Sequence, residues 1–240
     1  MEYGVLVKGE FQERELISIH AKGFENPITG RHGTYDHYVM KEINRSYGKL
    51  KVEDQIVLDV GANIGAFSCW ASQKKAKHVI SIEPEANNFA MLELNMRDHY
   101  GVESTLYNAG LHSSLDEPSV LYLATSGKNP GNSSTTPRRG RSESSINLMS
   151  VKSLKEKHPF IDVAKIDCEG AEYDFMELLI ESYPKMKQVS LEIHLSGFSI
   201  DKAVKLHHMM IENGYRTTVP PRLDNDRLWQ TLATYNKDVI

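Results

Sequence analysis

The sequence has few cysteines, no long apolar run and almost no excess of charge. Cys69 and Cys168 are its only cysteines, too few for a disulfide framework, and neither has a partner at metal-ligand spacing. No run of about 18 apolar residues occurs, so no transmembrane helix is expected. The first residues, Met1–Val5, include an acid where a secretion signal carries positive charge. These absences predict a cytoplasmic protein.

The excess of negative over positive charge is also small. The 28 Lys and Arg residues against 32 Asp and Glu residues give a formal net charge of -4. Such a balance argues against a surface built throughout to hold nucleic acid or an anionic membrane. With 40% hydrophobic and 25% charged residues among 240, the chain has the composition of one globular domain with an appendage.

Two regions of the chain differ in pattern. Residues 1–53 are mixed, and they predict an N-terminal extension with short strands at Tyr3–Val7 and Glu15–His20, read as a hairpin, and a helix at Tyr35–Tyr47. Residues 54–240 alternate short β-branched runs with amphipathic stretches. This alternation is typical of βαβ units in a parallel sheet, so the second region is expected to be the main α/β domain.

Two segments interrupt that alternation. Residues 124–145 are rich in Ser, Gly and Arg, and are expected to form a mobile loop or an extended hairpin. Their basic cluster, Pro137–Arg141, could bind a phosphate or a carboxylate of a small substrate, or could simply be solvated. The late run Gln230–Tyr235 is expected to add one antiparallel strand at or near an edge of the sheet.

The run Val57–Gly65 predicts a ligand site, because an apolar strand enters a glycine-containing turn that opens a helix. A dinucleotide fingerprint would have a second glycine at the position of Asn63, so a pyrophosphate, and with it NAD, is disfavoured. Asp59 adds negative charge, which favours a cofactor that carries an ammonium group. S-adenosylmethionine meets both conditions.

Glu83 ends the next expected strand, where a carboxylate can accept both hydroxyls of a ribose. Asn108, at the end of the third strand, is a candidate for the adenine side of the site, although it is equally typical of a turn. The candidate cofactor residues are Asp59, Gly61, Asn63, Gly65, Glu83 and Asn108.

Acidic residues cluster in the second half of the domain. Asp167 and Glu169 stand at the carboxyl end of a strand, and Glu172 stands in the first turn of the next helix. Acidic side chains are favourable beside the positive end of a helix dipole, which explains Glu169 and Glu172 but explains Asp167 less well. His194 ends the next strand on the same face as Glu192, and an imidazole beside a carboxylate is suited to taking a proton from a hydroxyl.

Four runs in this order resemble the FkbM-type S-adenosylmethionine-dependent methyltransferases. They are Leu58–Gly65, Glu83–Pro84, Lys165–Glu172 and Glu192–His194, and the resemblance covers roughly residues 56–193. It implies a Rossmann-like class I methyltransferase fold: a mostly parallel seven-stranded sheet with helices on both faces. It also implies O-methylation of a hydroxyl on a sugar or glycan, a macrolide or another small molecule.

The resemblance assigns roles to individual residues. Asp59, Gly61, Asn63, Gly65 and Glu83 would hold the cofactor. Asp167, Glu169 and His194 would line the reaction centre.

Two chemistries remain open at that centre. In the first, His194 or Asp167 is the base and Glu169 orients the acceptor. In the second, Asp167, Glu169 and His194 hold a divalent cation such as Mg or Mn, which would lower the pKa of the hydroxyl.

The sequence leaves alternative functions open. An RNA 2′-O-methyltransferase would use a Lys-Asp-Lys-Glu tetrad, for which Lys41, Asp167 and Glu192 offer three members. Lys185 and Lys187 lie at the wrong spacing for the fourth, and the net charge is unfavourable, so nucleic acid is an unlikely partner. A non-catalytic S-adenosylmethionine-binding protein is the alternative from another class.

Overall fold

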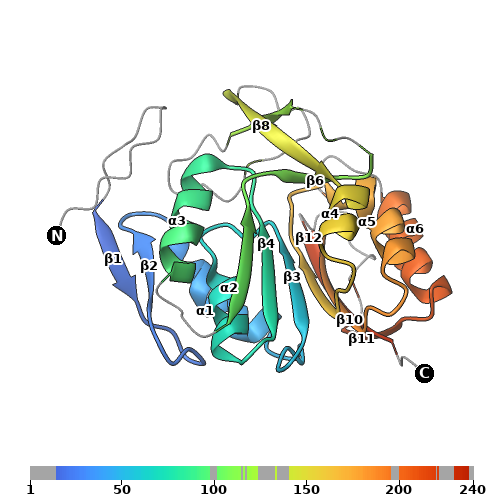
Figure 1. Cartoon of the computed structure of the whole chain (residues 1–240), viewed down its shortest axis with the longest axis horizontal. Coiled ribbons are helices and arrows are strands. Elements are labelled where there is room, and N and C mark those ends of the chain that lie inside the picture. The colour runs from blue at the N-terminus through green and yellow to red at the C-terminus, as the bar shows by residue number, and fades with distance from the viewer. Residues whose placement is uncertain are drawn as a thin grey trace.

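A seven-stranded, mostly parallel sheet forms the centre of the protein in the computed structural model (Figure 1). The structure describes residues 15–97, 102–114, 116, 118–123, 133, 141–195, 200–219, 221 and 230–237. In spatial order the strands are β11 (Arg216–Val219), β12 (Gln230–Asn236), β10 (Gln188–His194), β9 (Val163–Ile166), β3 (Ile56–Val60), β4 (His78–Ile82) and β5 (Glu103–Tyr107). The central strands β3, β4 and β9 are almost wholly buried, as expected for parallel strands covered on both faces.

Strand β12 is antiparallel to both of its neighbours, β10 and β11. The prediction of one reversed strand at the end of the chain is therefore confirmed. The strand lies one place in from the edge, because β11 pairs along its outer side.

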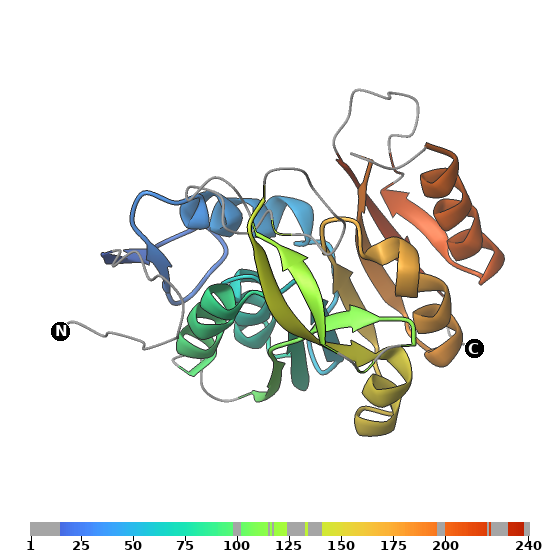
Figure 2. The same ribbon diagram turned by 90° about the horizontal axis from the view of Figure 1, so that it is seen from above.

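Helices cover both faces of the sheet, so the predicted fold class is confirmed (Figure 2). One layer holds α1 (Asp36–Ser46), α2 (Ala66–Gln73) and α3 (Ala86–Arg97). The other holds α4 (Val151–Lys157), α5 (Glu172–Ser182) and α6 (Ile200–Glu212). Each layer has its own hydrophobic cluster against the sheet. Side chains on β3 alternate between them, since Val57 belongs to the first cluster and Leu58 to the second.

The N-terminal region contains a hairpin and a helix, but the hairpin differs from the expected one. Strand β1 (Leu16–Ile19) pairs antiparallel with β2 (Ile28–Arg31), a strand that the sequence pattern did not reveal, and Tyr3–Val7 lies outside the described residues. Met40 and Ile43 of α1 are buried in the same cluster as Trp70 of α2. The extension therefore shares its hydrophobic core with the first helical layer.

The sequence pattern did not predict a third, three-stranded sheet. It consists of β6 (Gly110–His112), β7 (Pro118–Tyr122) and β8 (Glu143–Ser150), with β8 between the other two. Strands β7 and β8 form an antiparallel pair, so the segment 124–145 begins just past one strand of a hairpin and ends inside the other. This fits the extended-hairpin alternative; residues 124–132 and 134–140 lie outside the described residues.

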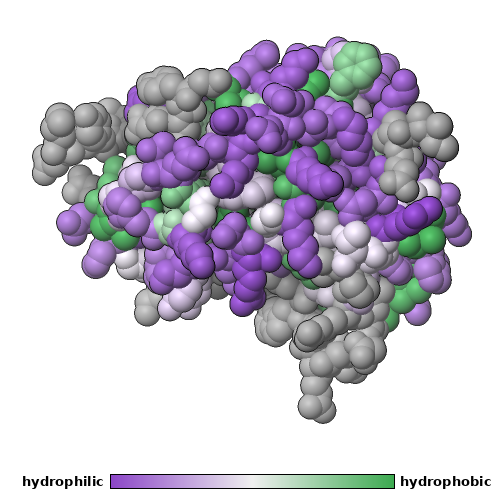
Figure 3. Space-filling model, turned by 90° about the horizontal axis from the view of Figure 1, so that it is seen from below, coloured by the Kyte–Doolittle hydropathy of each residue, from purple (hydrophilic) through white to green (hydrophobic). Residues whose placement is uncertain are grey.

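Polar and charged side chains cover most of the face drawn in Figure 3, where hydrophobic side chains show only in small separate areas. Within the described part of the chain, no helix is both long and apolar enough to cross a lipid bilayer.

Candidate active site

The turn after β3 depends on three residues in the left-handed region: Gly61 (φ 74°), Asn63 (φ 52°) and Gly65 (φ 86°). A Cβ at Gly61 would overlap the carbonyl oxygen of Asp167, and a Cβ at Gly65 would lie 2.8 Å from Leu92 Cδ1. Both glycines thus let the turn pack against β9 and α3. The sequence interpretation assigned their missing Cβ atoms to the approach of a ligand, whereas the structure places protein atoms there.

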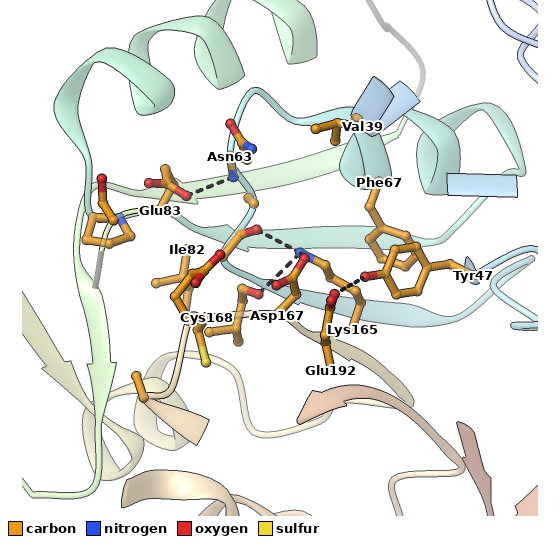
Figure 4. Close-up of a pocket in the computed structure, with 18 of the residues that line it drawn as sticks. Val39, Tyr47, Asn63, Phe67, Ile82, Glu83, Lys165, Asp167, Cys168 and Glu192 are labelled. Atoms are coloured by element: carbon orange, nitrogen blue, oxygen red, sulfur yellow. Dashed lines mark hydrogen bonds and ion pairs between the residues drawn. The ribbon is translucent and has the colours of Figure 1, made fainter. Parts of the chain in front are cut away.

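Glu83 lies directly after β4 and faces that turn (Figure 4). One carboxylate oxygen accepts the backbone N–H of Asn63 at 2.8 Å, and the other accepts that of Glu85 at 2.9 Å. Burial raises the pKa of Glu83 to about 7, against the effect of these two N–H donors. A carboxylate has about four acceptor positions, so two remain for further donors such as ribose hydroxyls.

Asn63 supplies a second polar group beside Glu83. Its side-chain oxygen Oδ1 is buried and has no hydrogen-bond partner in the described part of the chain. A buried acceptor without a partner is costly, so this atom is suited to a ligand that donates a hydrogen bond.

Asp59 does not present its charge to a ligand. Its side chain is fully buried, accepts a hydrogen bond from Ser68 Oγ at 2.6 Å and lies 3.2 Å from Lys165 Nζ. Asp59 is also not among the residues that line the cavity. The expectation that this carboxylate attracts an ammonium group has to be revised, because Lys165 already neutralises it.

Lys165 is a residue that the sequence interpretation missed. It lies on β9, is 4% exposed, and its Nζ donates to the carbonyl oxygen of Gly61 at 2.7 Å (Figure 4). Burial lowers its pKa, but the charges of Asp59 and Asp167 outweigh burial, so the pKa is raised and the side chain stays cationic. The signal was available: a lysine inside the buried run Val163–Ile166 requires a charged partner.

Asp167 and Glu192 lie side by side at the carboxyl ends of β9 and β10, and both line the cavity. Asp167 Oδ2 is 3.7 Å from Lys165 Nζ, and Glu192 Oε2 accepts a 3.5 Å hydrogen bond from the hydroxyl of Tyr47. Burial and then the charge of Asp167 raise the pKa of Glu192 to about 8. Glu192 was predicted only as a member of an RNA-type tetrad.

His194 lies behind these carboxylates. It is 3% exposed and does not line the cavity, and its Nε2 is 3.9 Å from Asp167 Oδ1 and 3.8 Å from Glu169 Oε2. Burial lowers its pKa, but the hydrogen bond and charge of Glu172, followed by Asp167 and Glu169, raise it to about 10. His194 is therefore an imidazolium at neutral pH and has no free site for a proton.

Glu169 lines the cavity, whereas Asn108 does not. Glu169 has a left-handed backbone (φ 54°) and lines the cavity with a side chain that is 21% exposed. Strained non-glycine backbone of this kind is concentrated at functional sites. Asn108 donates to the backbone oxygens of Glu83 and Pro84 at 2.9 and 3.2 Å and is not a lining residue, so it fastens the turn that carries Glu83.

The acidic cluster does not fit a divalent cation. Potential ligand atoms of Asp167, Glu192 and His194 lie within 4.8 Å of one another, whereas the expected set had Glu169 in place of Glu192. However, the ammonium of Lys165 and the imidazolium of His194 already lie against these carboxylates and offset part of their charge. A third cation would meet two positive charges at short range.

A cavity of about 660 Å³ joins these groups, a size typical of small-molecule sites. The turns after β3 and β4 contribute Gly61, Ala62, Asn63, Glu83 and Pro84. The carboxyl ends of β9 and β10 contribute Lys165, Asp167, Cys168, Glu169 and Glu192. The remaining wall comes mainly from α1. Predicted residues Gly61, Asn63, Glu83, Asp167 and Glu169 are thus brought together around one space.

The sequence resembles a known protein family, and the fold is similar to those of known proteins. A family model described as the methyltransferase FkbM domain matches residues 59–217. A putative SAM-dependent methyltransferase from Streptococcus mutans is similar in structure, with 12% identity, a TM-score of 0.54, and coverage of 96% of this chain and 57% of that chain. Precorrin-6y C5,15-methyltransferase from Geobacter metallireducens GS-15 has 14% identity, a TM-score of 0.48, and coverage of 87% and 92%. No curated protein matches the sequence.

Proposed function

The chain belongs to the FkbM family of S-adenosylmethionine-dependent methyltransferases, and we propose that it methylates a hydroxyl of a sugar, a glycan or another small molecule. One observation carries the proposal: Glu83, Asn63 and the carboxylates of Asp167 and Glu192 face the same cavity. This arrangement supports a methyl-donor site and a proton acceptor within reach of one ligand pair.

The residues present fit S-adenosylmethionine. Glu83 keeps two acceptor positions for the ribose hydroxyls, and Asn63 Oδ1 is a buried acceptor that needs a donor. When bound, S-adenosylmethionine supplies a methyl group made electrophilic by its sulfonium. Lys165 stiffens the floor of the site by fastening the carbonyl of Gly61 to β9.

The chain's own task is to align a hydroxyl oxygen and to remove its proton. Alignment of two reactants can contribute about 7–11 kcal/mol, and base catalysis about a hundredfold or more in rate. As the hydroxyl oxygen gains the methyl group, it becomes strongly acidic, and Asp167, or Glu192 in its ionised form, takes its proton. Glu169 orients the acceptor. His194 stabilises the two carboxylates as a buried cation and is not the base in this account.

RNA is the weaker candidate for the acceptor. Lys185 and Lys187 precede β10, so they lie at the opposite end of that strand from His194, and Lys187 pairs with Asp162 at 2.9 Å. Lys41 is an exposed residue of α1 and does not line the cavity. The carboxylates Asp167 and Glu192 would repel phosphates. We also place the reaction in the cytoplasm, which the two free cysteines support.

Transfer of labelled methyl from S-adenosylmethionine tests the proposal. The purified chain is incubated with a panel of methyl glycosides and phenols and with a short RNA. Label is expected in a small-molecule hydroxyl. Asp167→Asn and Glu192→Gln each remove one candidate base, and the substitution that removes the true base should lower kcat about a hundredfold. Glu177→Gln, on the exposed face of α5, is the matched control. Label in RNA alone, or none with the donor bound, would overturn the proposal.

A further inference from the structure

The α1 side of the cavity lies outside the region that matches the family model. That match begins at residue 59, whereas this wall is formed by residues 35–47. The lining residues of this wall are Tyr35, Tyr38, Val39, Glu42, Ile43, Arg45, Ser46 and Tyr47. The family-type turns therefore supply the donor side of the cavity, and the extension supplies the opposite wall.

Two aromatic rings at the start of this wall are open to solvent. Tyr35 is 45% exposed and Tyr38 is 53% exposed, and their rings meet edge to face at 5.5 Å. The centroid of the His37 ring lies 4.0 Å from that of Tyr38, so the two rings are in contact. Because the two ring planes of Tyr35 and Tyr38 are 80° apart, the rings form an apolar corner, in which a ligand can pack a face on one ring and an edge against the other.

Charged groups of both signs stand on the same wall. Glu42 and Arg45 follow Tyr38 by four and seven residues, which places them on the same side of α1. A carboxylate accepts and a guanidinium donates hydrogen bonds in pairs, a combination that suits neighbouring hydroxyls. The two charges balance, so the wall does not attract a polyanion.

We propose that α1 is the acceptor-binding element and that its ligand is a sugar ring, packed on Tyr35 and Tyr38 with its hydroxyls bound by Glu42 and Arg45. This inference rests on the proposed O-methyl transfer. A sugar ring has an apolar C–H face and a rim of hydroxyls, which matches an aromatic face beside a paired acid and base. Tyr47, at the end of the same wall, donates to Glu192, so the wall leads directly to the proton-accepting edge.

The other classes of acceptor fit this wall less well. A nucleic acid could stack on the tyrosines, but its phosphates would meet Glu42 and, deeper in the cavity, Asp167 and Glu192. A simple phenol would use the rings and leave Glu42 and Arg45 without partners.

The test is steady-state methyl transfer to the glycoside that the panel above labels best. Tyr35→Ala and Tyr38→Ala are each expected to raise KM for the glycoside about tenfold, while kcat changes by less than about threefold. Tyr38→Phe keeps the ring and should restore most of the affinity. Phe160→Ala is the matched control, since Phe160 is 68% exposed and does not line the cavity.

Calorimetric binding of S-adenosylhomocysteine by each variant separates this inference from the proposed function. Unchanged binding together with the raised KM supports an acceptor role for α1. A glycoside KM that matches the Phe160→Ala control, or label only in phenol, overturns the inference while leaving the proposed function intact. Label only in RNA overturns both. If the wild-type chain does not bind S-adenosylhomocysteine, the proposed function itself fails.

Discussion

Glu172 binds both the backbone and the ring of His194. Its Oε1 accepts the N–H of His194 at 2.8 Å and lies 3.2 Å from the ring Nδ1, while its Oε2 accepts the N–H of Gly170 at 2.9 Å. The Glu172 side chain is fully buried. One carboxylate thereby joins the ends of β9 and β10 and fixes the backbone on which Asp167 and Glu192 stand.

Substitution of Glu172 should destabilise the protein strongly. Glu172→Gln leaves the His194 cation buried without its main counter-charge, and breaking a buried pair in this way costs about 3 kcal/mol of unfolding free energy. Urea denaturation measures the change. Glu177→Gln, an exposed position on the same helix, should change it by less than about 0.5 kcal/mol. Equal effects of the two substitutions would show that the pair contributes nothing.

Stability should depend on pH through His194. The pKa of His194 rises from 6.5 to about 10 on folding, so the folded state holds this proton more tightly than the unfolded state does. The stabilisation is complete below about pH 6.5 and is lost as the pH rises toward 10. Unfolding free energies of the wild type and His194→Gln, compared at pH 6.5 and pH 9.5, should converge at the higher pH. A constant difference would contradict the charged state of His194.

Methyl transfer should be independent of divalent cations. Because Lys165 and His194 already place two positive charges against the carboxylates at the site, EDTA is expected to leave kcat unchanged, and added Mg or Mn should give no increase. The measurement is the initial rate with labelled S-adenosylmethionine after dialysis against EDTA. A loss of activity that Mg or Mn restores would establish a metal site at this edge.

Two glycines with similar backbone angles should respond differently to alanine. Gly61 (φ 74°) abuts the carbonyl of Asp167, whereas a Cβ at Gly214 (φ 84°) would meet only Lys237 Cε at 3.6 Å. Gly214→Ala should therefore cost about 1 kcal/mol from backbone strain alone. Gly61→Ala should cost at least about 2 kcal/mol more, since β3 and β9 must move apart. Thermal unfolding of both variants checks this, and equal losses would refute the packing role of Gly61.

Much of the sheet could be predicted from the sequence because its central strands are short runs rich in Val and Ile, and most are followed by a glycine or an acidic residue. β3, β4 and β9 are of this kind, since Gly61, Glu83 and Asp167 follow them. β6 has only three residues, and β8 mixes polar and apolar residues without a clear period, so neither produces a recognisable pattern.

The roles of the charged residues were harder to predict, because they depend on strand pairing. Asp59 and Lys165 are 106 positions apart, yet they are direct partners in the register of β3 and β9. A sequence pattern places each on a strand but does not show that the two charges meet. For the same reason His194 was expected, as an alternative to Asp167, to be the base, since its buried contact with Glu172 exists only once the strand ends come together.

The central claim is that Glu83 binds the cofactor. Calorimetric titration with S-adenosylhomocysteine, with NAD as a control ligand, tests it most directly. The account predicts micromolar binding by the wild type, a loss of at least about a hundredfold with Glu83→Ala, and no binding of NAD. Wild-type affinity in Glu83→Ala, or binding of NAD in place of S-adenosylhomocysteine, would contradict it.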